Sequence, residues 1–538
     1  MQKKLSEILT KVSFSNYTLL NSPTKNDPII TALEFDSRKI TKNSLYFSLP
    51  GTHVHGNQFI AQAIQKGAKA IVFQDDLENQ KEELISLLNT IPEAERPIFI
   101  KVPSSRYAMA PISDAFYDYP STKLGIIGVT GTEGKSTTVY LIWQFLQLLS
   151  KKAGFISTVQ YSLGDEALDN SEHQTTPEAP IINQRLFSMI ENNCEFAVIE
   201  SSSHGLSEKT NRLGTIAFDA GAMMNVTHEH LEFHGTHEQY KYDKANLFRA
   251  LDKNTHTKAI CNKTVSFNPI SAVNMEDESA SYFNDSTQAK TIGFTIKPVE
   301  KAAFIPDEYY YVTDITNSPE GSRFVVHHNI SQKQQIIQSY LPGEFNIYNI
   351  LAAAILVASL LKKDVFEVLA LTEKLLPVKG RMTQIKQGQN FEVLVDYAHT
   401  PSSFETIFPP LRKRAKGKII ALFGSGGERD TIKRPIQGEI AAKYCDIVIL
   451  ADEDPRGEDP VTLLEMIAAG CSNLVREESL FIIPDRKKAI RKAFSLAQEN
   501  DIVLLLGKSH ENSIIYKDYV MPYDEITEAE KALQELKK

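Results

Sequence analysis

The residues best suited to chemistry lie in a glycine-rich stretch, GVTGTEGKSTT, at positions 128–138. Lys135 and Ser136, near its end, would supply the cation and the hydroxyl that a phosphate-binding loop offers to phosphate oxygens and to magnesium. The loop is longer than the common GxxxxGK[ST] motif, because Gly131 is inserted and five residues separate the first glycine from Gly134. An apolar run precedes the loop and apolar residues at helical spacing follow it. The sequence therefore predicts strand, phosphate loop and helix in that order, and nucleotide binding.

A second chemically dense stretch, NVTHEHLEFHGTHEQYKYDKANLF, covers residues 225–248. Its histidines and carboxylates follow a predicted strand, and loops at strand ends commonly carry the functional groups of α/β proteins. Oxygen ligands would favour magnesium, whereas clustered histidines favour zinc. The spacing alone leaves both metals open, and it also fits a polar surface that holds no metal.

The elements that must position these residues indicate an α/β protein of three domains. Residues 1–120 contain short strand-like runs, LYFSLPG and AKAIVFQ, around the helical stretch FIAQAIQKGA, which predicts a small α/β domain. Residues 121–376 begin with the phosphate loop and add expected strands at 196–201 and 220–227, which predicts a parallel-sheet ATPase-like domain. Residues 377–538 contain four β runs, each ending in a polar or glycine-rich turn, with helical segments between them. This last pattern predicts a Rossmann-like, doubly wound sheet.

The bulk composition is that of an ordinary globular protein. A chain of 538 residues is too long for one hydrophobic core, and 58 Lys and Arg against 67 Asp and Glu give a mild formal charge of −9. This charge predicts that neither nucleic acid nor a membrane surface is a partner. The most apolar run, at 350–361, is too short to cross a bilayer, and the N-terminus lacks a signal-peptide core. We therefore expect a cytoplasmic protein whose four scattered cysteines are reduced.

The order of motifs along the chain strongly resembles that of the Mur ligases. The resemblance rests on GTEGKSTT, on TTP at 175–177, on ESSSHGL at 200–206 and on THEHLEFHGTHEQYKYDK at 227–244. PGEFNIYN, KGRM, DYAHTP, FGSGGERDTIKRP, DEDPRGEDP and GKSHE are similar to the MurE-type branch, the UDP-N-acetylmuramoyl-tripeptide synthetases. The segment 36–72, which begins DSRKITKN, is similar to the UDP-sugar domain of that branch. The family's loop, GTxGK[ST]T, also accounts for the inserted glycine.

The resemblance implies an ATP-dependent amide ligase of peptidoglycan precursor synthesis. Such an enzyme phosphorylates a substrate carboxylate, and an amine then attacks the acyl phosphate. The implied partners are UDP-N-acetylmuramoyl-L-Ala-D-Glu and a diamino acid, with meso-diaminopimelate favoured by a small margin over L-lysine and ornithine. The implied cofactors are ATP, two Mg²⁺ ions and an N6-carboxylysine formed from Lys244, and a monomer is expected.

The resemblance also assigns roles to single residues. For ATP it implies Gly131, Thr132, Gly134, Lys135, Ser136, Thr137, Asn346 and Asp396. For the metal it implies Ser136, Glu200, His230 and Lys244 as its carbamate, and among these groups Lys135, His230 and Lys244 would be catalytic. For the UDP-muramoyl-dipeptide it implies Ser37, Arg38, Thr175, Thr176, Ser202 and Arg212, and for the amino acid Arg381, Asp454, Arg456, Gly507 and Glu511.

The amino-acid segment departs from the diaminopimelate-adding members, which carry DNPR where this chain has EDPR. Arg456 suits a distal carboxylate, whereas Asp454 would repel it and attract a lone ammonium. If Asp454 pairs with Arg456, a lysine-like side chain becomes more acceptable. The phosphate loop also differs from the family, with Glu133 in the place of the usual asparagine.

Two other classes of protein compete with this prediction. Another ligase of the same superfamily, such as folylpolyglutamate synthetase, shares the loop but not the N-terminal DSR segment or the paired DEDPR and GKSHE motifs. A P-loop nucleotide switch or binding module is the second alternative, although NKTV at 262–265 lacks the aspartate of a guanine-binding NKxD motif.

Overall fold

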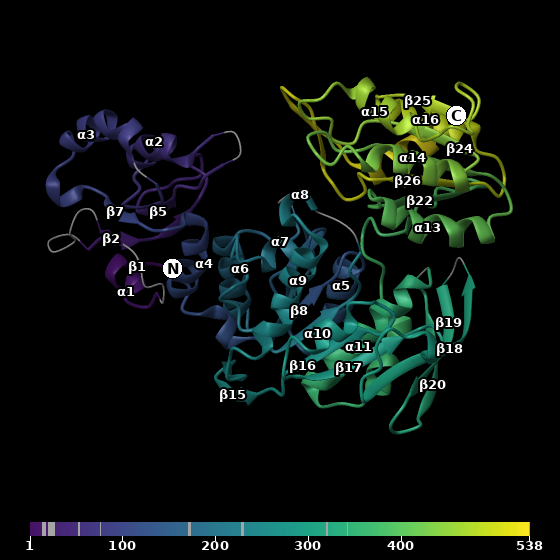
Figure 1. Cartoon of the computed structure of the whole chain (residues 1–538), viewed down its shortest axis with the longest axis horizontal. Coiled ribbons are helices and arrows are strands. Elements are labelled where there is room, and N and C mark those ends of the chain that lie inside the picture. The colour runs from purple at the N-terminus through teal and green to yellow at the C-terminus, as the bar shows by residue number, and fades with distance from the viewer. Residues whose placement is uncertain are drawn as a thin grey trace.

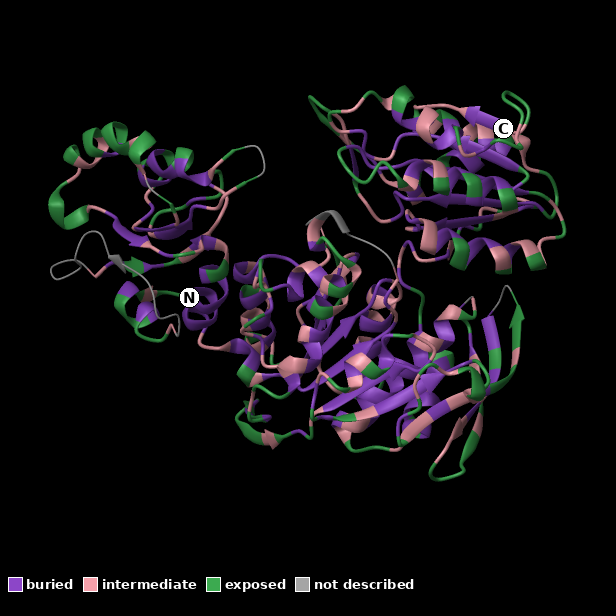
Figure 2. Ribbon diagram, viewed as in Figure 1, coloured by how far each residue is buried: buried purple, intermediate pink, exposed green. Residues whose placement is uncertain are grey.

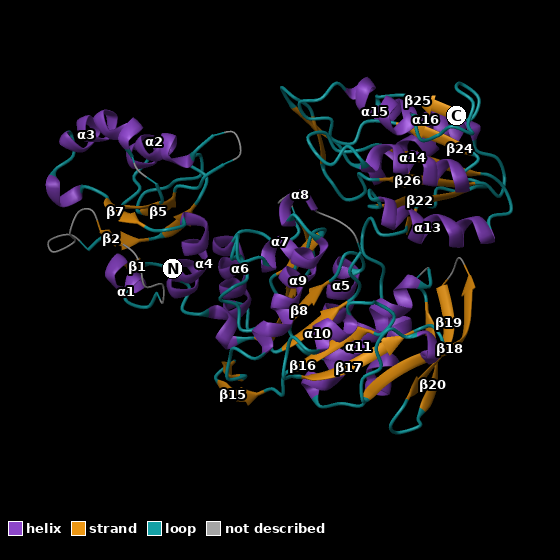
Figure 3. Cartoon of the chain, in the orientation of Figure 1, coloured by secondary structure: helices purple, strands orange, loops and turns teal. Residues whose placement is uncertain are grey.

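The computed structural model describes residues 1–12, 18–19, 27–51, 54–75, 77–170, 174–227, 231–318, 321–341 and 343–536. Figure 1 shows three α/β units along the chain, with the N-terminal and C-terminal units at opposite sides and the central unit between and below them. Each unit is built on its own main sheet, as Figure 3 shows. The predicted three-part α/β architecture is therefore confirmed.

The N-terminal unit is a five-stranded sheet in the order β2-β7-β6-β5-β4. Its strands are β2 (Thr18–Leu19), β4 (Ala32–Glu34), β5 (Ser44–Phe47), β6 (Ala70–Phe73) and β7 (Ile98–Lys101), and only β2 runs antiparallel to its neighbour. Successive side chains of a strand point to opposite faces. Leu45 and Phe47 therefore pack with α1 (Leu5–Leu9) and α4 (Ser105–Phe116), while Tyr46 packs with α2 (Ile60–Gln65) and α3 (Lys81–Asn89).

The central unit is an eleven-stranded sheet whose parallel middle part holds the phosphate loop. Strand β8 (Gly125–Thr130) lies between β12 (Phe196–Glu200) and β13 (Ala220–Met223), and all six of its residues are buried. Parallel strands covered on both faces are apolar throughout, and this makes β8 recognisable in the sequence. Figure 2 shows this buried middle of the sheet. Strands β9 (Ala153–Ile156), β16 (Ile270–Asn274) and β17 (Lys290–Thr295) extend it on either side.

Helices cover both faces of this sheet. One face packs against α5 (Lys135–Leu148) and α11 (Phe345–Leu361), and the other against α6 (Ala179–Glu191) and α9 (His237–Leu251). Helix α11 contains the most apolar run of the chain, and its residues from Ile350 to Ala358 are all buried. None of the described helices combines the length and the apolarity that crossing a membrane requires.

Three strands at one edge of the central sheet were not predicted; the first runs parallel to β17, and the three alternate in direction after it. They are β18 (Glu308–Ser318), β19 (Gly321–His328) and β20 (Gln334–Ser339), and they follow β17 in the sheet order. A short antiparallel pair, β10 (Gln160–Ser162) and β11 (Leu168–Asp169), closes the other edge. The parallel core thus ends in antiparallel strands on both sides.

The C-terminal unit is a six-stranded sheet in the order β21-β22-β26-β23-β24-β25. The four predicted β runs form its parallel centre, which consists of β22 (Glu392–Asp396), β26 (Ile502–Leu506), β23 (Ile419–Phe423) and β24 (Ile447–Leu450). One face packs against α13 (Pro401–Arg414), α14 (Lys433–Tyr444) and α15 (Pro460–Ala468), and the other against α16 (Arg486–Leu496) and α17 (Glu525–Leu536). The loops that follow β22, β24 and β26 therefore leave the sheet at the same end, where the carboxyl ends of these parallel strands lie.

A buried ion pair holds two of these loops in place. Arg486, the first residue of α16, donates to both carboxylate oxygens of Glu525, at 2.9 and 2.7 Å, and neither side chain is exposed. The same guanidinium donates to the backbone carbonyls of Asp452, at 3.2 Å, and Leu506, at 2.6 Å. One side chain thus ties the ends of β24 and β26 together.

Replacing Arg486 with methionine would leave the Glu525 carboxylate buried without a counter-charge, and we expect the C-terminal unit to lose about 3–5 kcal/mol of stability. The matched control is Arg491→Met, which breaks the partly exposed pair with Glu535 and should cost less than about 1 kcal/mol. Hydrogen exchange at the amides of β24 and β26 measures the loss of stability in both variants. Tryptophan fluorescence would not, because the single tryptophan, Trp143, lies on α5 in the central unit. Equal protection in the two variants would contradict the assigned role of the pair.

Candidate active site

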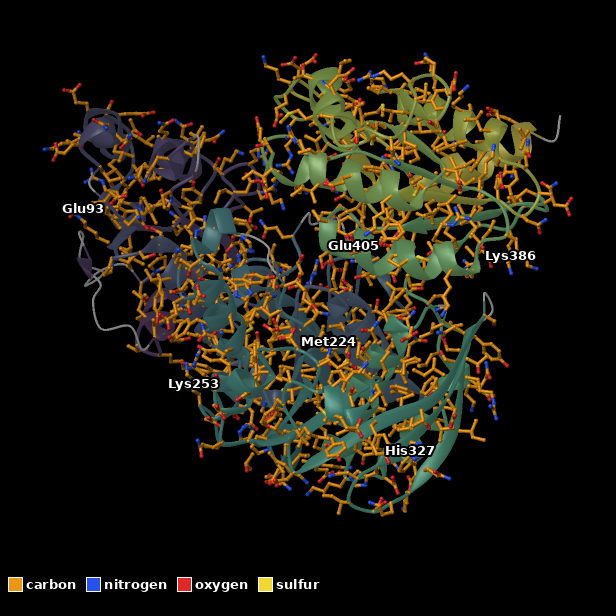
Figure 4. The ribbon with its side chains drawn as sticks, turned by 45° about the vertical axis from the view of Figure 1, so that its right-hand side comes forward. Glu93, Met224, Lys253, His327, Lys386 and Glu405 are labelled. Carbon is orange, nitrogen blue, oxygen red and sulfur yellow. The ribbon has the colours of Figure 1, made fainter. Side chains whose placement is uncertain are left out.

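The phosphate loop joins β8 to α5 through two glycines in the left-handed region. Gly131 has φ 152° and Gly134, the residue before α5, has φ 83°. A Cβ atom on Gly131 would lie 2.9 Å from the Cβ of Met224, a residue inside the central unit (Figure 4). The inserted glycine is therefore required by both backbone conformation and space. Lys135 begins the helix, and its Nζ donates to the carbonyl of Thr132 at 2.6 Å.

Asn225, which sequence reasoning missed, supports this loop from the segment after β13. Its side-chain oxygen accepts from the backbone N–H groups of Thr132 and Glu133 at 3.0 and 2.8 Å. The Thr132 hydroxyl in turn lies 3.1 Å from the hydroxyl of Tyr240 on α9. The loop is thus shaped by contacts from elements about 90 residues away.

An oxygen-rich group lies where the resemblance implies a metal. The Ser136 hydroxyl donates to one carboxylate oxygen of Glu200, the last residue of β12, at 3.0 Å. The other oxygen accepts from the backbone N–H of Thr158 at 2.8 Å. Hydroxyl and carboxylate oxygens are ligands that suit Mg²⁺, so these residues fit the implied ion. Within the described ranges, three or more His, Cys, Asp or Glu residues do not gather into a metal-binding group. The predicted ligand His230 lies outside those ranges.

Lys244 is buried on α9 beside the phosphate loop. Its side chain is almost wholly inaccessible, Nζ donates to the carbonyl of Gly131 at 2.6 Å, and it lies 4.5 Å from the centre of the Tyr240 ring. Buried lysines are rare in globular proteins. The structure thus brings Lys244 to the loop, as the resemblance implies, while its modification stays a prediction.

A buried hydrogen-bond chain that was not predicted joins three helices around Lys244. Nδ1 of His234, at the end of α8 (Leu231–His234), lies 2.7 Å from the Asp243 carboxylate on α9. Nε2 lies 3.0 Å from the hydroxyl of Ser203, the first residue of α7 (Ser203–Leu206). These contacts fix α7 and α8 against the helix that carries Lys244.

Three of the predicted muramoyl-dipeptide residues lie together next to Glu200. The Thr176 hydroxyl donates to the carbonyl of Glu200 at 2.7 Å, and the Ser202 hydroxyl donates to the Thr176 hydroxyl at 2.9 Å. Arg212 donates to the carbonyl of Thr176 at 2.8 Å.

Glu178, which was not predicted, links this group to the N-terminal unit. Its carboxylate accepts at 2.8 Å from Arg212 and, also at 2.8 Å, from Arg106 on α4. A carboxylate between two arginines of different units stabilises their contact.

Ser37 and Arg38, which were also predicted to bind the UDP-muramoyl-dipeptide, lie apart from this group, on the loop after β4. Ser37 is buried and its carbonyl accepts from Lys66 at 3.0 Å. Arg38 is 86% exposed and pairs with Asp36 at 2.8 Å. Within the described part of the chain, no hydrogen bond or ion pair joins Ser37 or Arg38 to another candidate site residue.

Of the two predicted ATP residues outside the phosphate loop, Asn346 and Asp396, the first is tied to the phosphate-loop helix. Its side-chain oxygen accepts from Asn349 at 3.0 Å, and the oxygen of Asn349 accepts from Thr138 on α5 at 3.1 Å. Asp396 ends β22, and its two oxygens accept from the backbone N–H groups of Met382 and Ala398, each at 2.8 Å. Burial raises the pKa of Asp396.

The amino-acid residues form a compensated charge cluster, but the conditional pairing of Asp454 with Arg456 is wrong. Lys508 provides the counter-charge instead, because its Nζ donates to Asp454 at 2.8 Å and also to Glu511. The backbone N–H of Ile515 donates a second bond to Asp454 at 2.9 Å. Arg456 has a left-handed backbone, φ 53°, and its buried Nε has no hydrogen-bond partner among the described residues.

Gly507 allows a buried carboxylate to approach the end of β26. Its φ is 93°, and a Cβ atom there would lie 2.6 Å from Oε2 of Glu453. Burial raises the pKa of Glu453 above its usual range, with the Glu511 carboxylate adding to this effect against Lys433 and Lys508. A buried carboxylate oxygen without a hydrogen-bond partner among the described residues, Oε2 of Glu453, thus lies beside Gly507.

The C-terminal unit meets the phosphate loop through a few polar contacts. Nη2 of Arg381 lies 3.4 Å from the Ser136 hydroxyl. The hydroxyl of Thr400, at the start of α13, donates to the Glu133 carboxylate at 3.4 Å. Beside these contacts lies a pocket whose lining comes from both units. Its lining residues are Thr158, Asn170, Thr175, Tyr397, His510, Glu511 and Asn512. Predicted residues for the dipeptide and for the amino acid thus share one pocket.

Family comparison agrees with this geometry. Residues 29–117 match the catalytic domain of the Mur ligase family, residues 129–357 the Mur ligase middle domain, and residues 380–509 the Mur ligase glutamate ligase domain. The chain belongs to the Mur ligase family. The predicted family and its ATP-dependent amide-ligase activity are therefore confirmed.

This Mur ligase is 51% identical to the UDP-N-acetylmuramyl-tripeptide synthetase of Treponema denticola over 94% of each chain. It is 36% identical to the UDP-N-acetylmuramoyl-L-alanyl-D-glutamate–2,6-diaminopimelate ligase of Geobacillus thermodenitrificans, over 95% of this chain and 96% of that protein. A solved structure of a ligase of that second name superimposes with a TM-score of 0.57 at 26% identity, covering 95% of this chain and 96% of the other.

Replacing Lys135 with alanine should lower ATP-dependent phosphate release at least about 100-fold, because the cation that neutralises the migrating phosphoryl group is lost. The matched control is Lys151→Ala, just beyond the other end of α5, where the lysine pairs with Glu195. Turnover of the Lys135 variant within several-fold of the parent protein would show that the loop has been misassigned.

Proposed function

We propose that this Mur ligase joins a diamino acid to UDP-N-acetylmuramoyl-L-alanyl-D-glutamate, through an acyl phosphate, in the synthesis of peptidoglycan precursors. Residues 1–120 would bind the UDP-sugar, residues 121–376 ATP, and residues 377–538 the amino acid. Among diamino acids we favour meso-diaminopimelate by a small margin over L-lysine and ornithine.

The observation that carries this proposal is the pocket shared by the central and C-terminal units. Thr175 lines it from the muramoyl-dipeptide side and Glu511 from the amino-acid side. Arg381 reaches from the C-terminal unit toward Ser136 of the phosphate loop. A carboxylate, an amine and the γ-phosphate of ATP must meet for this reaction, and these three groups of residues border one another.

The proposed reaction has two steps. A carboxylate oxygen of the D-glutamyl residue attacks the γ-phosphorus of ATP, the bond to the β-phosphate oxygen breaks, and ADP leaves. The amine then attacks the acyl carbon, the carbon–oxygen bond to phosphate breaks, and the nitrogen releases a proton. Lys135 would lie against the phosphate oxygens during the first step, and Arg381 would face the anionic intermediate from the C-terminal unit.

Mg²⁺ would be held by the oxygens of Ser136 and Glu200, together with a carbamate on Lys244. When bound, the ion neutralises phosphate charge and orients the phosphate oxygens. An unmodified Lys244 ammonium would repel a cation at this place, whereas its carbamate supplies oxygen ligands. The burial of Lys244 beside Gly131 supports this assignment.

The charges of the amino-acid pocket support a diamino acid. Lys508 neutralises Asp454, so repulsion of a distal carboxylate is weaker than the isolated sequence predicted. The buried Nε of Arg456 has no hydrogen-bond partner among the described residues, which suits capture of a carboxylate. This arrangement keeps meso-diaminopimelate ahead of the amino acids that end in a lone ammonium.

The direct test is phosphate release with ATP, UDP-N-acetylmuramoyl-L-Ala-D-Glu and each of the three diamino acids in turn. We expect release that depends on both the dipeptide substrate and one diamino acid. Phosphate release that needs neither substrate would refute the proposal. So would phosphate release that depends on glutamate and a folate, as expected of a folylpolyglutamate synthetase.

Lys244→Ala should be almost inactive, because a metal ligand would be lost. A short-chain carboxylic acid or added bicarbonate should restore part of the rate by supplying the missing carboxylate. Lys253→Ala, an exposed lysine just beyond the same helix (Figure 4), should behave like the parent protein. Full activity of the Lys244 variant without any added carboxylic acid or bicarbonate would rule out a carbamate on Lys244 as a required metal ligand.

Asp454→Asn should shift the kcat/KM preference toward meso-diaminopimelate by roughly tenfold, about 1.4 kcal/mol, because a negative charge near the distal group is removed. Asp459→Asn is the matched control, since Asp459 caps α15 and asparagine is an equally good cap. An unchanged preference among the three amino acids would mean that Asp454 does not read the distal group.

A further inference from the structure

Among the described residues that line the shared pocket, His510 is the one whose side chain is a neutral nitrogen base. It follows β26 in the GKSH turn and lines the pocket together with Glu511 of the same unit and Thr175 of the central unit. These two neighbours are the residues proposed to hold the amine substrate and the muramoyl-dipeptide. The imidazole therefore lies where the nitrogen and the acyl carbon would meet.

The imidazole of His510 is unused by the protein itself. Neither ring nitrogen is hydrogen-bonded to a described residue, and Nδ1 is also sealed from solvent. The ring is held by packing, with its centre 4.6 Å from that of Tyr397. Buried polar atoms without partners are uncommon in folded proteins, and at a pocket wall such an atom points to a ligand.

Its surroundings keep this histidine neutral. Burial lowers the pKa of His510 far below its usual value, and the positive charges of Arg381 and Lys508 lower it further. A neutral imidazole keeps a lone pair for accepting a proton. Anionic phosphate groups in the pocket would offset the nearby cations and make the imidazole a stronger base during the reaction.

The other candidate bases in the pocket are already committed. The Glu511 carboxylate accepts from Lys508 and, at 3.1 Å, from the hydroxyl of Tyr397. Burial, with the charge of Glu511, raises the pKa of Tyr397 well above its usual value, so that its hydroxyl stays protonated. The remaining lining residues are threonines and asparagines, which are not bases at neutral pH.

We propose that His510 accepts the proton that the amine nitrogen loses when the amide forms; this inference rests on the function proposed above. The nitrogen lone pair forms the bond to the acyl carbon, and the carbon–oxygen bond to phosphate breaks. The extra N–H proton passes to the imidazole, and the resulting imidazolium releases it to solvent. The positively charged nitrogen formed when the amine adds to the acyl carbon is more acidic than the ammonium form of the free amine, so a weak base is sufficient.

The test separates the two steps of the reaction in the full-length enzyme. Hydroxylamine, which is unprotonated at neutral pH and attacks acyl phosphates without an enzyme base, converts the intermediate to a hydroxamate when no diamino acid is present. In His510→Ala, peptide formation should fall about 10²–10⁴-fold while hydroxamate formation stays near the parent rate. Imidazole in solution should restore part of the peptide formation. Retained hydroxamate formation also shows that the variant is folded.

The matched control is His399→Asn. The His399 ring also packs against Tyr397, but His399 is not among the residues that line the pocket. It should leave the ratio of peptide to hydroxamate formation unchanged. Equal losses of both products in His510→Ala, or peptide formation close to that of the parent protein, would overturn the role of His510. If the parent protein makes no hydroxamate, the acyl-phosphate function itself fails, and this outcome differs from the other two.

Discussion

The register between two neighbouring parallel strands determines the rest of the active site. Glu200 of β12 pairs with Val129 of β8, so that the strand ends meet beside the phosphate loop. This register brings the Glu200 carboxylate to 3.0 Å from Ser136, and its backbone carbonyl to the Thr176 hydroxyl. A slip by one residue would turn the carboxylate to the other face of the sheet. The metal-binding oxygens and the dipeptide residues therefore depend on one pairing.

Charge compensation, rather than apolar packing, orders the C-terminal side of the pocket. Lys508 faces both Asp454 and Glu511, and Arg486 faces Glu525 behind them. Buried charges are costly unless they are paired and hydrogen-bonded. Because each of these cations contacts more than one element, pairing also fixes the loops after β24 and β26. The neutral His510 lies inside this arrangement because its neighbours are already paired with one another.

The sequence predicted what is encoded locally and missed what arises from contacts between distant segments. The phosphate loop, the buried helix α11 and the four parallel strands of the C-terminal unit all follow from apolar runs and glycine spacing. Asn225, Glu178 and the His234–Asp243 pair carry no local signal, because each contacts a residue on another element or in another unit. The sequence suggested Arg456, two residues away, as a possible partner of Asp454, yet its partner, Lys508, comes from the loop after a different strand, β26. Local spacing does not determine the partners of a buried charge.

The position of β26 in its sheet has a consequence for how the chain is made. This strand lies at the centre of the C-terminal sheet, between β22 and β23, yet it is the last of the parallel strands in the sequence. During synthesis, β22 and β23 leave the ribosome more than 70 residues before the strand that joins them. The two earlier units can fold while the chain is growing, but the C-terminal sheet cannot close until almost the whole protein has been translated. A chain that stops short of residue 502 would therefore lose the whole unit, and not merely its last helix.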